Sequence, residues 1–367
     1  MRLPPSPTEL SSAAANVYDM VLGGGLADLR RTPASIIAEA PQQTVFRYLV
    51  PEGATAPQRD LPVLLVPPLA APPVCFDLRR GCSLVEHLLA AGHPTYLVDY
   101  GRIGFSDREL GLEHWIEDVI PSAVRIVSAD AGGRPVQVVG WCLGGIMALL
   151  AAAARPDLPV NAIAAVASPF DFAQVRLLQT ISPVMRLGGE RLLDPLYRFL
   201  GGAPAPLVRR AFQLTSIDKE LTKPLARLAH LDDRDYLAQI EAVDHFMRHM
   251  HAYPGRTFGQ LYHRFFRVND LADGHFALDG RDIELADVRV PVLSVAGEGD
   301  VLAPVAAVQH VAQLLTNAPD VRLEVGPGGH LGVLTGRGAR TTTWTWIDAF
   351  FAAHGSDRRA PELRVVA

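Results

Sequence analysis

Cys142 lies in a sequence pattern that is suited to nucleophilic chemistry. The run Gly140-Trp141-Cys142-Leu143-Gly144 follows a β-rich segment and precedes an Ala- and Leu-rich one. Glycines two residues before and two residues after the cysteine permit a strained strand-to-helix turn that exposes a nucleophile. The helix N-terminus would stabilise a thiolate, and the backbone N–H of Leu143 would face the oxyanion. The alternative is an ordinary buried cysteine, since free cysteines are often buried.

Two later loops supply the other candidate side chains. Asp300 ends the loop Gly297-Glu298-Gly299-Asp300, which follows a predicted strand, and we expect it to orient a histidine. Glu298 is the second choice, and a solvated loop acid or helix cap at Asp300 is the alternative. His330 lies in the glycine-rich loop 326–332 after another predicted strand. Of the 12 histidines, this one combines the expected chain order with a flexible loop.

Together, Cys142, Asp300 and His330 predict acyl transfer through a thiol. His330 would accept the thiol proton, and Asp300 would fix the tautomer of the imidazole. A sulfur nucleophile favours a thioester donor, because the acyl group then passes between two sulfur atoms with little change in energy. Cys75 and Cys82 lack the flanking glycines, so we expect both to be passive.

Strands and helices must alternate along the chain to position these loops. We expect strands at residues 95–100, 136–140, 162–167, 291–296 and 322–325, and helices at residues 83–91, 113–129, 143–154, 305–315 and 341–353. Residues 45–50 and 61–66 are expected to form a hairpin that opens the sheet. This alternation, with the order Cys, Asp, His, predicts the α/β-hydrolase fold, in which helices flank a mostly parallel sheet.

The alternation stops between residues 172 and 288, which predicts an inserted helical cap with helical spacing at residues 192–200 and 232–251. The expected division is a helical lead-in at 1–40, the first part of the core at 41–172, the cap at 173–288, the second part of the core at 289–354, and a flexible tail at 355–367.

Composition excludes several classes of function. Hydrophobic residues make up 49% of the chain, charged residues 20%, and the net charge is −5. No cluster of Lys and Arg is present that would bind nucleic acid. The three cysteines do not form a disulfide framework, and no secretory signal or membrane-spanning run is seen, so a cytoplasmic protein is expected. No motif for a metal or bound cofactor is present.

Most of the chain resembles the polyhydroxyalkanoate synthases. The resemblance rests first on Gly140 to Gly144, on Asp300, and on the Gly-Gly-His-Leu-Gly loop around His330. The other shared residues are Thr32-Pro33, Asp77-Leu78, Ser83-Leu84 with Gly92-His93, Leu97-Val98-Asp99-Tyr100, Ser168-Pro169-Phe170-Asp171-Phe172, and Asn269-Asp270-Leu271 with Gly274, Leu278 and Gly280. The short lead-in is similar to that of the shorter synthases that work with a partner subunit.

The resemblance implies a 3-hydroxyacyl-coenzyme A substrate, whose acyl group passes through Cys142 to a growing polyester. It also implies a second synthase subunit, a homodimer, and binding to the polyester granule surface. This chain departs from the family pattern in two places. Residues 70–74, Ala-Ala-Pro-Pro-Val, replace an Asn followed by a basic residue and Tyr, and Val301 replaces a His after the aspartate.

The sequence leaves two other functions open. One is a thiol-dependent esterase, thioesterase or small-acceptor acyltransferase of the same fold, in which water or another alcohol resolves the acyl-enzyme. The other is a non-catalytic granule-associated protein. Retention of Cys142, Asp300 and His330 argues against the latter, because a binding module does not need that order of residues.

Overall fold

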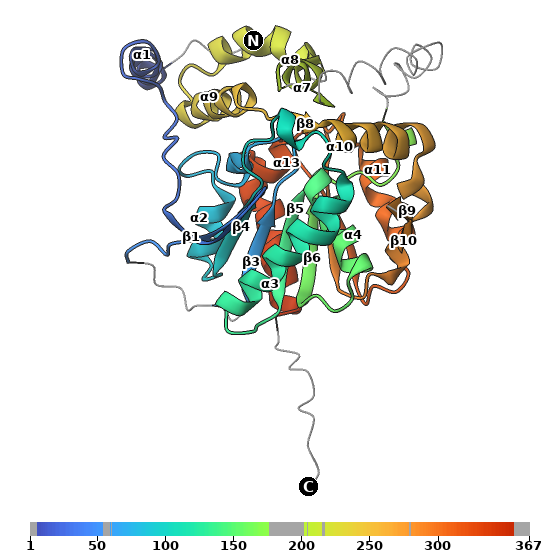
Figure 1. Ribbon diagram of the computed structural model, residues 1–367. Coiled ribbons are helices and arrows are strands. Elements are labelled where there is room, and N and C mark those ends of the chain that lie inside the picture. The colour runs from blue at the N-terminus through green and yellow to red at the C-terminus, as the bar shows by residue number, and fades with distance from the viewer. Residues whose placement is uncertain are drawn as a thin grey trace, which may run out of the picture.

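A sheet of eight strands forms the centre of the molecule (Figure 1). The structure is a computed structural model, and it describes residues 6–53, 59, 61–175, 202–203, 205–214, 217–278 and 280–355. In spatial order the strands are β1 (Ala34–Ala40), β2 (Gln43–Tyr48), β4 (Thr95–Asp99), β3 (Val63–Val66), β5 (Val136–Trp141), β6 (Val160–Val166), β11 (Val292–Gly297) and β12 (Val321–Gly326). The pairs β1–β2 and β2–β4 are antiparallel, and all pairs from β4 to β12 are parallel. This is the mostly parallel sheet that the alternation predicted.

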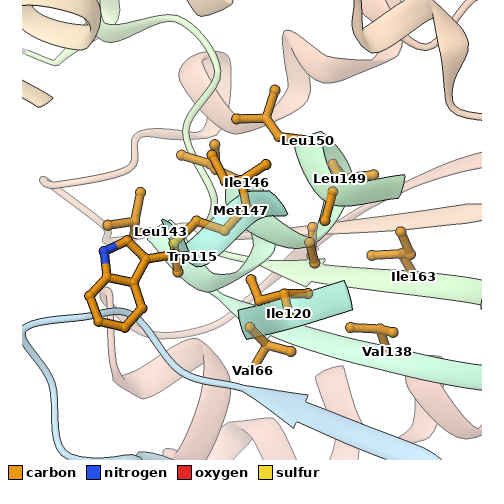
Figure 2. Close-up of a cluster of buried hydrophobic side chains, with 14 of the residues drawn as sticks. Val66, Trp115, Ile120, Val138, Leu143, Ile146, Met147, Leu149, Leu150 and Ile163 are labelled. Carbon is orange, nitrogen blue, oxygen red and sulfur yellow. The ribbon is translucent and has the colours of Figure 1, made fainter. Parts of the chain in front are cut away.

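Helices cover both faces of the sheet because the central strands are apolar on both faces. One face carries α3 (Ile120–Asp130) and α4 (Leu143–Ala154), and the other carries α2 (Leu84–Ala90) and α14 (Thr343–Ala353). In β5, Val138 packs in the first hydrophobic cluster and Val139 in the second. Figure 2 shows the first cluster, where Val66 and Ile163 of the neighbouring strands accompany Val138 beneath Met147 of α4.

The start of the chain differs from expectation in two places. Residues 7–21 form the helix α1 (Pro7–Val21), but residues 34–40 form the edge strand β1 instead of a helix. Most residues of β1 are exposed, so the segment lacks the apolar alternation that marks a strand. The predicted hairpin is also wrong, because β4 lies between β2 and β3. β3 is buried at every position and lies inside the sheet, whereas β2 alternates and lies nearer the edge.

The chain between β6 and β11 forms the insertion. Among the described residues, its longer helices are α7 (Ala205–Leu214), α8 (Ile217–Ala229), α9 (Arg234–Arg248), α10 (Gly255–Gln260) and a π-helix (Leu261–Val268). Figure 1 shows α7, α8 and α9 together at one end of the sheet, with α1 beside α9. The insertion also contains an unexpected hairpin, β9 (His275–Leu278) and β10 (Arg281–Glu284). The predicted helical stretch at 192–200 and the tail residues 356–367 lie outside the described residues. The domain boundaries therefore stay a prediction.

Candidate active site

Cys142 lies on a tight turn between β5 and α4. Its backbone has φ 54° and ψ −123°, a conformation that non-glycine residues adopt only under strain. A Cβ atom on Gly140 would lie 2.5 Å from the Cα of Gly145, and one on Gly144 would lie 2.1 Å from the carbonyl oxygen of Val66. The turn therefore requires glycine at both positions that the sequence pattern identified.

Hydrogen bonds hold this strained turn on both sides. The Cys142 N–H donates to the Val166 carbonyl at 2.8 Å, and the Cys142 carbonyl accepts from the Ser168 hydroxyl at 2.8 Å and from the Gly145 N–H at 3.1 Å. Leu143 is the first residue of α4, so its N–H has no acceptor within the helix. The Leu143 N–H, which the sequence predicts to bind an oxyanion, is thus the backbone donor directly after Cys142. The sequence alone does not reveal this role of Ser168, because there it is only a serine that follows a predicted strand.

His330 and Asp300 meet across two loops at the same edge of the sheet. Nδ1 of His330 lies 2.8 Å from Oδ2 of Asp300, whose side chain is fully buried. Oδ1 of the same carboxylate accepts the N–H groups of Leu302 and Ala303 at 2.8 and 2.9 Å. These bonds fix the carboxylate against the imidazole. Glu298, the second choice, is exposed and donates only its backbone N–H to this loop region.

The charges around His330 favour its protonated form. Burial alone would lower the pKa of His330, but the negative charges of Asp300 and Cys142, with hydrogen bonds to both side chains, raise that pKa well above its ordinary value. The imidazolium form of His330 is therefore stabilised beside Cys142. The structure brings together all three side chains that the sequence singled out, in an arrangement that can perform nucleophilic chemistry.

Trp141 is a further residue of this site that the sequence did not identify. Its indole N–H donates to the carbonyl oxygen of His330 at 3.0 Å, and the two rings lie 5.2 Å apart. The indole also lies near Phe246 of α9, with the two ring centroids 6.2 Å apart. Trp141 thus connects the turn that carries the cysteine to the loop that carries the histidine. The only sequence signal was its place beside Cys142.

The remaining cysteines and the other conspicuous histidines lie apart from this arrangement. Cys75 and Cys82 are both buried, and burial raises the pKa of the Cys75 thiol well above its usual range. Cys82 lies against the carbonyl oxygen of Thr335. His93 is buried, which lowers its pKa to about 4. His310 contacts a backbone carbonyl through Nε2.

A cavity of about 150 Å³ opens beside the sulfur of Cys142. Its wall is almost entirely apolar, and residues of both the core and the insertion contribute to it, among them Phe172, Val175, Tyr253, Leu261, Phe265 and Phe266. Phe172 stacks on Phe265 with ring centroids 5.1 Å apart. We call this space the apolar cavity. Its size and lining suit a short aliphatic chain attached to the reacting carbonyl.

Two kinds of feature are absent from the described part of the chain. Among the residues described, no group of three or more His, Cys, Asp or Glu side chains could hold a metal ion. Within the same residues, no helix has both the length and the apolar character needed to cross a membrane.

Comparison with known proteins places this geometry in a wider context. A family model described as the alpha/beta hydrolase fold matches residues 62–200. Poly(3-hydroxyalkanoate) polymerase subunit PhaC of Allochromatium vinosum is 28% identical over 337 residues, which cover 89% of this chain and 92% of that protein. The subunit of the same name from Synechocystis sp. is 28% identical over 312 residues, which cover 82% and 79%. The structure of mouse alpha/beta hydrolase domain-containing protein 10 is 16% identical, covers 88% of this chain and 99% of that one, and has a TM-score of 0.49.

The family match and the parallel sheet confirm the predicted fold class. The relatives confirm the resemblance that the motifs indicated, and their names agree with the prediction of an acyltransferase. The chain therefore has the α/β-hydrolase fold and resembles the polyhydroxyalkanoate synthases over most of its length.

Proposed function

We propose that this chain transfers 3-hydroxyacyl groups from coenzyme A thioesters to a growing polyester, with Cys142, His330 and Asp300 as its catalytic triad. One observation carries the proposal: Cys142 lies on a strained turn, and it lines an apolar cavity together with His330, which the buried Asp300 holds. The similarity to polymerase subunits supports the choice of substrate.

In the first step the Cys142 sulfur attacks the carbonyl carbon of the thioester. A new C–S bond to the enzyme forms, and the Leu143 N–H stabilises the negative charge that develops on the carbonyl oxygen. The bond from that carbon to the coenzyme A sulfur then breaks. The departing thiolate takes a proton from the His330 imidazolium, whose raised pKa keeps that proton available.

In the second step a hydroxyl group takes the acyl group from the enzyme. Acylation neutralises the Cys142 sulfur, so one of the charges that raised the pKa of His330 is gone. His330 can then accept the proton of the attacking hydroxyl, whose oxygen bonds to the acyl carbon. The C–S bond to Cys142 breaks, and the thiolate and imidazolium return. If the hydroxyl belongs to a 3-hydroxyacyl chain, the polyester grows by one unit.

The proposal extends to the setting in which the protein works. We infer a cytoplasmic protein that acts as a homodimer at the surface of a polyester granule, together with a second synthase subunit. The relatives' names, which describe polymerase subunits, support the second subunit.

A thioesterase or small-acceptor acyltransferase is the second candidate. The observation in its favour is the changed loop after β3, Ala71-Pro72-Pro73, since the backbone just before it contacts the nucleophile turn at Gly144. A different loop beside the oxyanion position would alter which acceptor reaches the acyl group. The chemistry up to the acyl-enzyme would be the same.

The test is to incubate the purified protein with 3-hydroxybutyryl-coenzyme A and to measure both free coenzyme A and insoluble polyester. A Cys142→Ala variant serves as the control, and a Cys75→Ala variant controls for the loss of a thiol elsewhere. Cys142-dependent release with polyester supports the synthase. Release without polyester moves the protein to the second candidate. No release, also after adding a partner subunit from a related synthase, would overturn the proposal.

A further inference from the structure

A second cavity, of about 490 Å³, lies beside the apolar cavity. The chain at residues 251–253 separates the two, since His251 and Ala252 line the larger cavity and Tyr253 lines the apolar one. The polar wall of the larger cavity consists of Arg31, Asp99, Arg102, His245, His249 and His251. We call this space the basic pocket.

Two guanidinium groups give the basic pocket its charge. Arginine stays protonated at any physiological pH. Within the described part of the chain, neither Arg31 nor Arg102 takes part in an ion pair. Asp99 contributes the one carboxylate among the lining residues described, and its Oδ1 already accepts the Gly101 N–H at 2.9 Å. The pocket is therefore positive even when its histidines are neutral.

The pKa values of two histidines in the basic pocket are lowered, in part by the neighbouring cationic groups. Burial lowers the pKa of His245, and the neighbouring cationic groups His249, Arg248 and Arg31 lower it further, while Glu241 acts in the opposite direction. Burial likewise lowers the pKa of His251, with Arg102 acting in the same direction and Asp99 against it. Burial disfavours a charge of either sign, whereas the neighbouring cationic groups favour an anion. Metal binding is not the alternative, because no described group of side chains could hold a metal ion.

The other walls of the basic pocket are largely apolar. Pro72, Pro73 and Val74 form one side, and they belong to the loop in which this chain departs from the synthase pattern. The loop is tied to the insertion where the His251 N–H donates to the Ala70 carbonyl at 2.8 Å. Ala70 belongs to the hydrophobic cluster against which Cys142 packs. The loop that lines the basic pocket therefore belongs to the same hydrophobic cluster as Cys142.

We propose that the basic pocket binds the nucleotide end of the coenzyme A thioester, with Arg31 and Arg102 facing its 3′-phosphate and pyrophosphate. The proline-rich side would contact the adenine ring, and the pantetheine arm would pass residues 251–253 to bring the thioester to Cys142. This inference rests on the proposed function, because it names the part of the molecule that recognises the donor. Phosphate groups with a flat apolar base match a pocket of paired cations and apolar walls.

The test compares two donors that share the reacting group. One is 3-hydroxybutyryl-coenzyme A, and the other is the 3-hydroxybutyryl thioester of N-acetylcysteamine, which lacks the nucleotide. Arg31→Gln and Arg102→Gln should each raise KM for the first donor about tenfold and leave kcat and the second donor unchanged. Arg30→Gln is the matched control, because Arg30 is exposed and pairs with Asp28 outside the pocket. If the two variants raised KM equally for both donors, or left both KM values unchanged, the inference would be overturned.

Calorimetry on the Cys142→Ala protein separates this inference from the proposed function. Adenosine 3′,5′-bisphosphate should bind, and either arginine variant should weaken that binding about tenfold. If the bisphosphate binds in an arginine-dependent way but the unaltered protein does not turn over the thioester, the result supports the pocket and contradicts the proposed function. If the unaltered protein turns over the thioester but neither arginine variant changes the affinity for the bisphosphate, only the inference about the pocket is contradicted. Inorganic phosphate that binds as tightly as the bisphosphate would also overturn the inference, since the pocket would then be a general anion site.

Discussion

The apolar cavity and the basic pocket are neighbours with opposite wall chemistry. The apolar cavity, of about 150 Å³, contains the proposed reacting side chains Cys142 and His330 among mostly aromatic and aliphatic ones. The basic pocket, of about 490 Å³, is lined by exposed cations on loops. The reacting groups are fixed by buried hydrogen bonds, whereas the cations stand on the surface. The difference indicates that bond making and donor recognition are separable. Variants in the apolar cavity should therefore change the reaction with both donors, whereas variants in the basic pocket should change KM for the coenzyme A donor alone.

The largest effect is expected for Cys142→Ala. Removal of the sulfur removes the atom that forms the acyl-enzyme, so thiol release should fall by about 10⁴-fold or more with either donor. The measurement is the initial rate of thiol release with the coenzyme A thioester and with the truncated thioester. Loss with one donor alone would break the proposed separation, because the sulfur must serve both.

Asp300→Asn should lower kcat/KM for both donors by about 10³- to 10⁴-fold, because the amide cannot fix the required tautomer of His330. Burial lowers the pKa of His330 and Asp300 raises it, so without the carboxylate charge the imidazolium should lose its proton at lower pH. The alkaline limb of the kcat/KM profile should therefore move to lower pH. If the alkaline limb of the profile did not move, the pairing of Asp300 with His330 would be contradicted.

Trp141→Phe should reduce kcat about tenfold with both donors, since the indole N–H that holds the His330 loop would be lost while the ring remains. The matched control is Trp344→Phe. Trp344 is also buried, and its N–H donates to the Leu334 carbonyl at 2.7 Å away from the apolar cavity. Both variants should lose about 1 kcal/mol of stability to unfolding. If both lost activity equally, Trp141 would have no positioning role.

The smallest effect is expected at the wall of the apolar cavity. Phe266→Ala should widen it and raise kcat/KM for 3-hydroxyhexanoyl-coenzyme A relative to 3-hydroxybutyryl-coenzyme A by about fivefold. The side chain is 40% exposed, so the fold should tolerate the change. Competition between the two thioesters in one reaction measures the ratio. A change in the inhibition constant of adenosine 3′,5′-bisphosphate would instead show that the cavities are not independent.

The sequence predicted the parts of the molecule that local patterns determine. Gly140 and Gly144 indicate the turn because only glycine fits there, and Asp300 and His330 stand in loops after apolar strands. The edge strand β1 was missed because exposed strands carry little apolar alternation. The place of β3 was misjudged because strand order depends on packing between distant segments.

The basic pocket could not be predicted at all. Its lining comes from separate segments that only the folded insertion brings together, around Arg31, residues 72–74, residues 99–103, and residues 245–252. None of these segments carries a phosphate-binding motif. The hydrogen bond from Trp141 to His330 joins residues 189 positions apart, so it too depends on tertiary structure.

The central claim is that the acyl group passes through the sulfur of Cys142, and the most direct test is to isolate that intermediate. Protein mixed with 3-hydroxybutyryl-coenzyme A would be quenched in acid within the first turnovers, digested and analysed by mass spectrometry. We predict a 3-hydroxybutyryl thioester on the peptide that contains Cys142, absent from Cys142→Ala and unaffected by Cys75→Ala. Release of coenzyme A with an unmodified Cys142 peptide, or continued release by Cys142→Ala, would contradict the account.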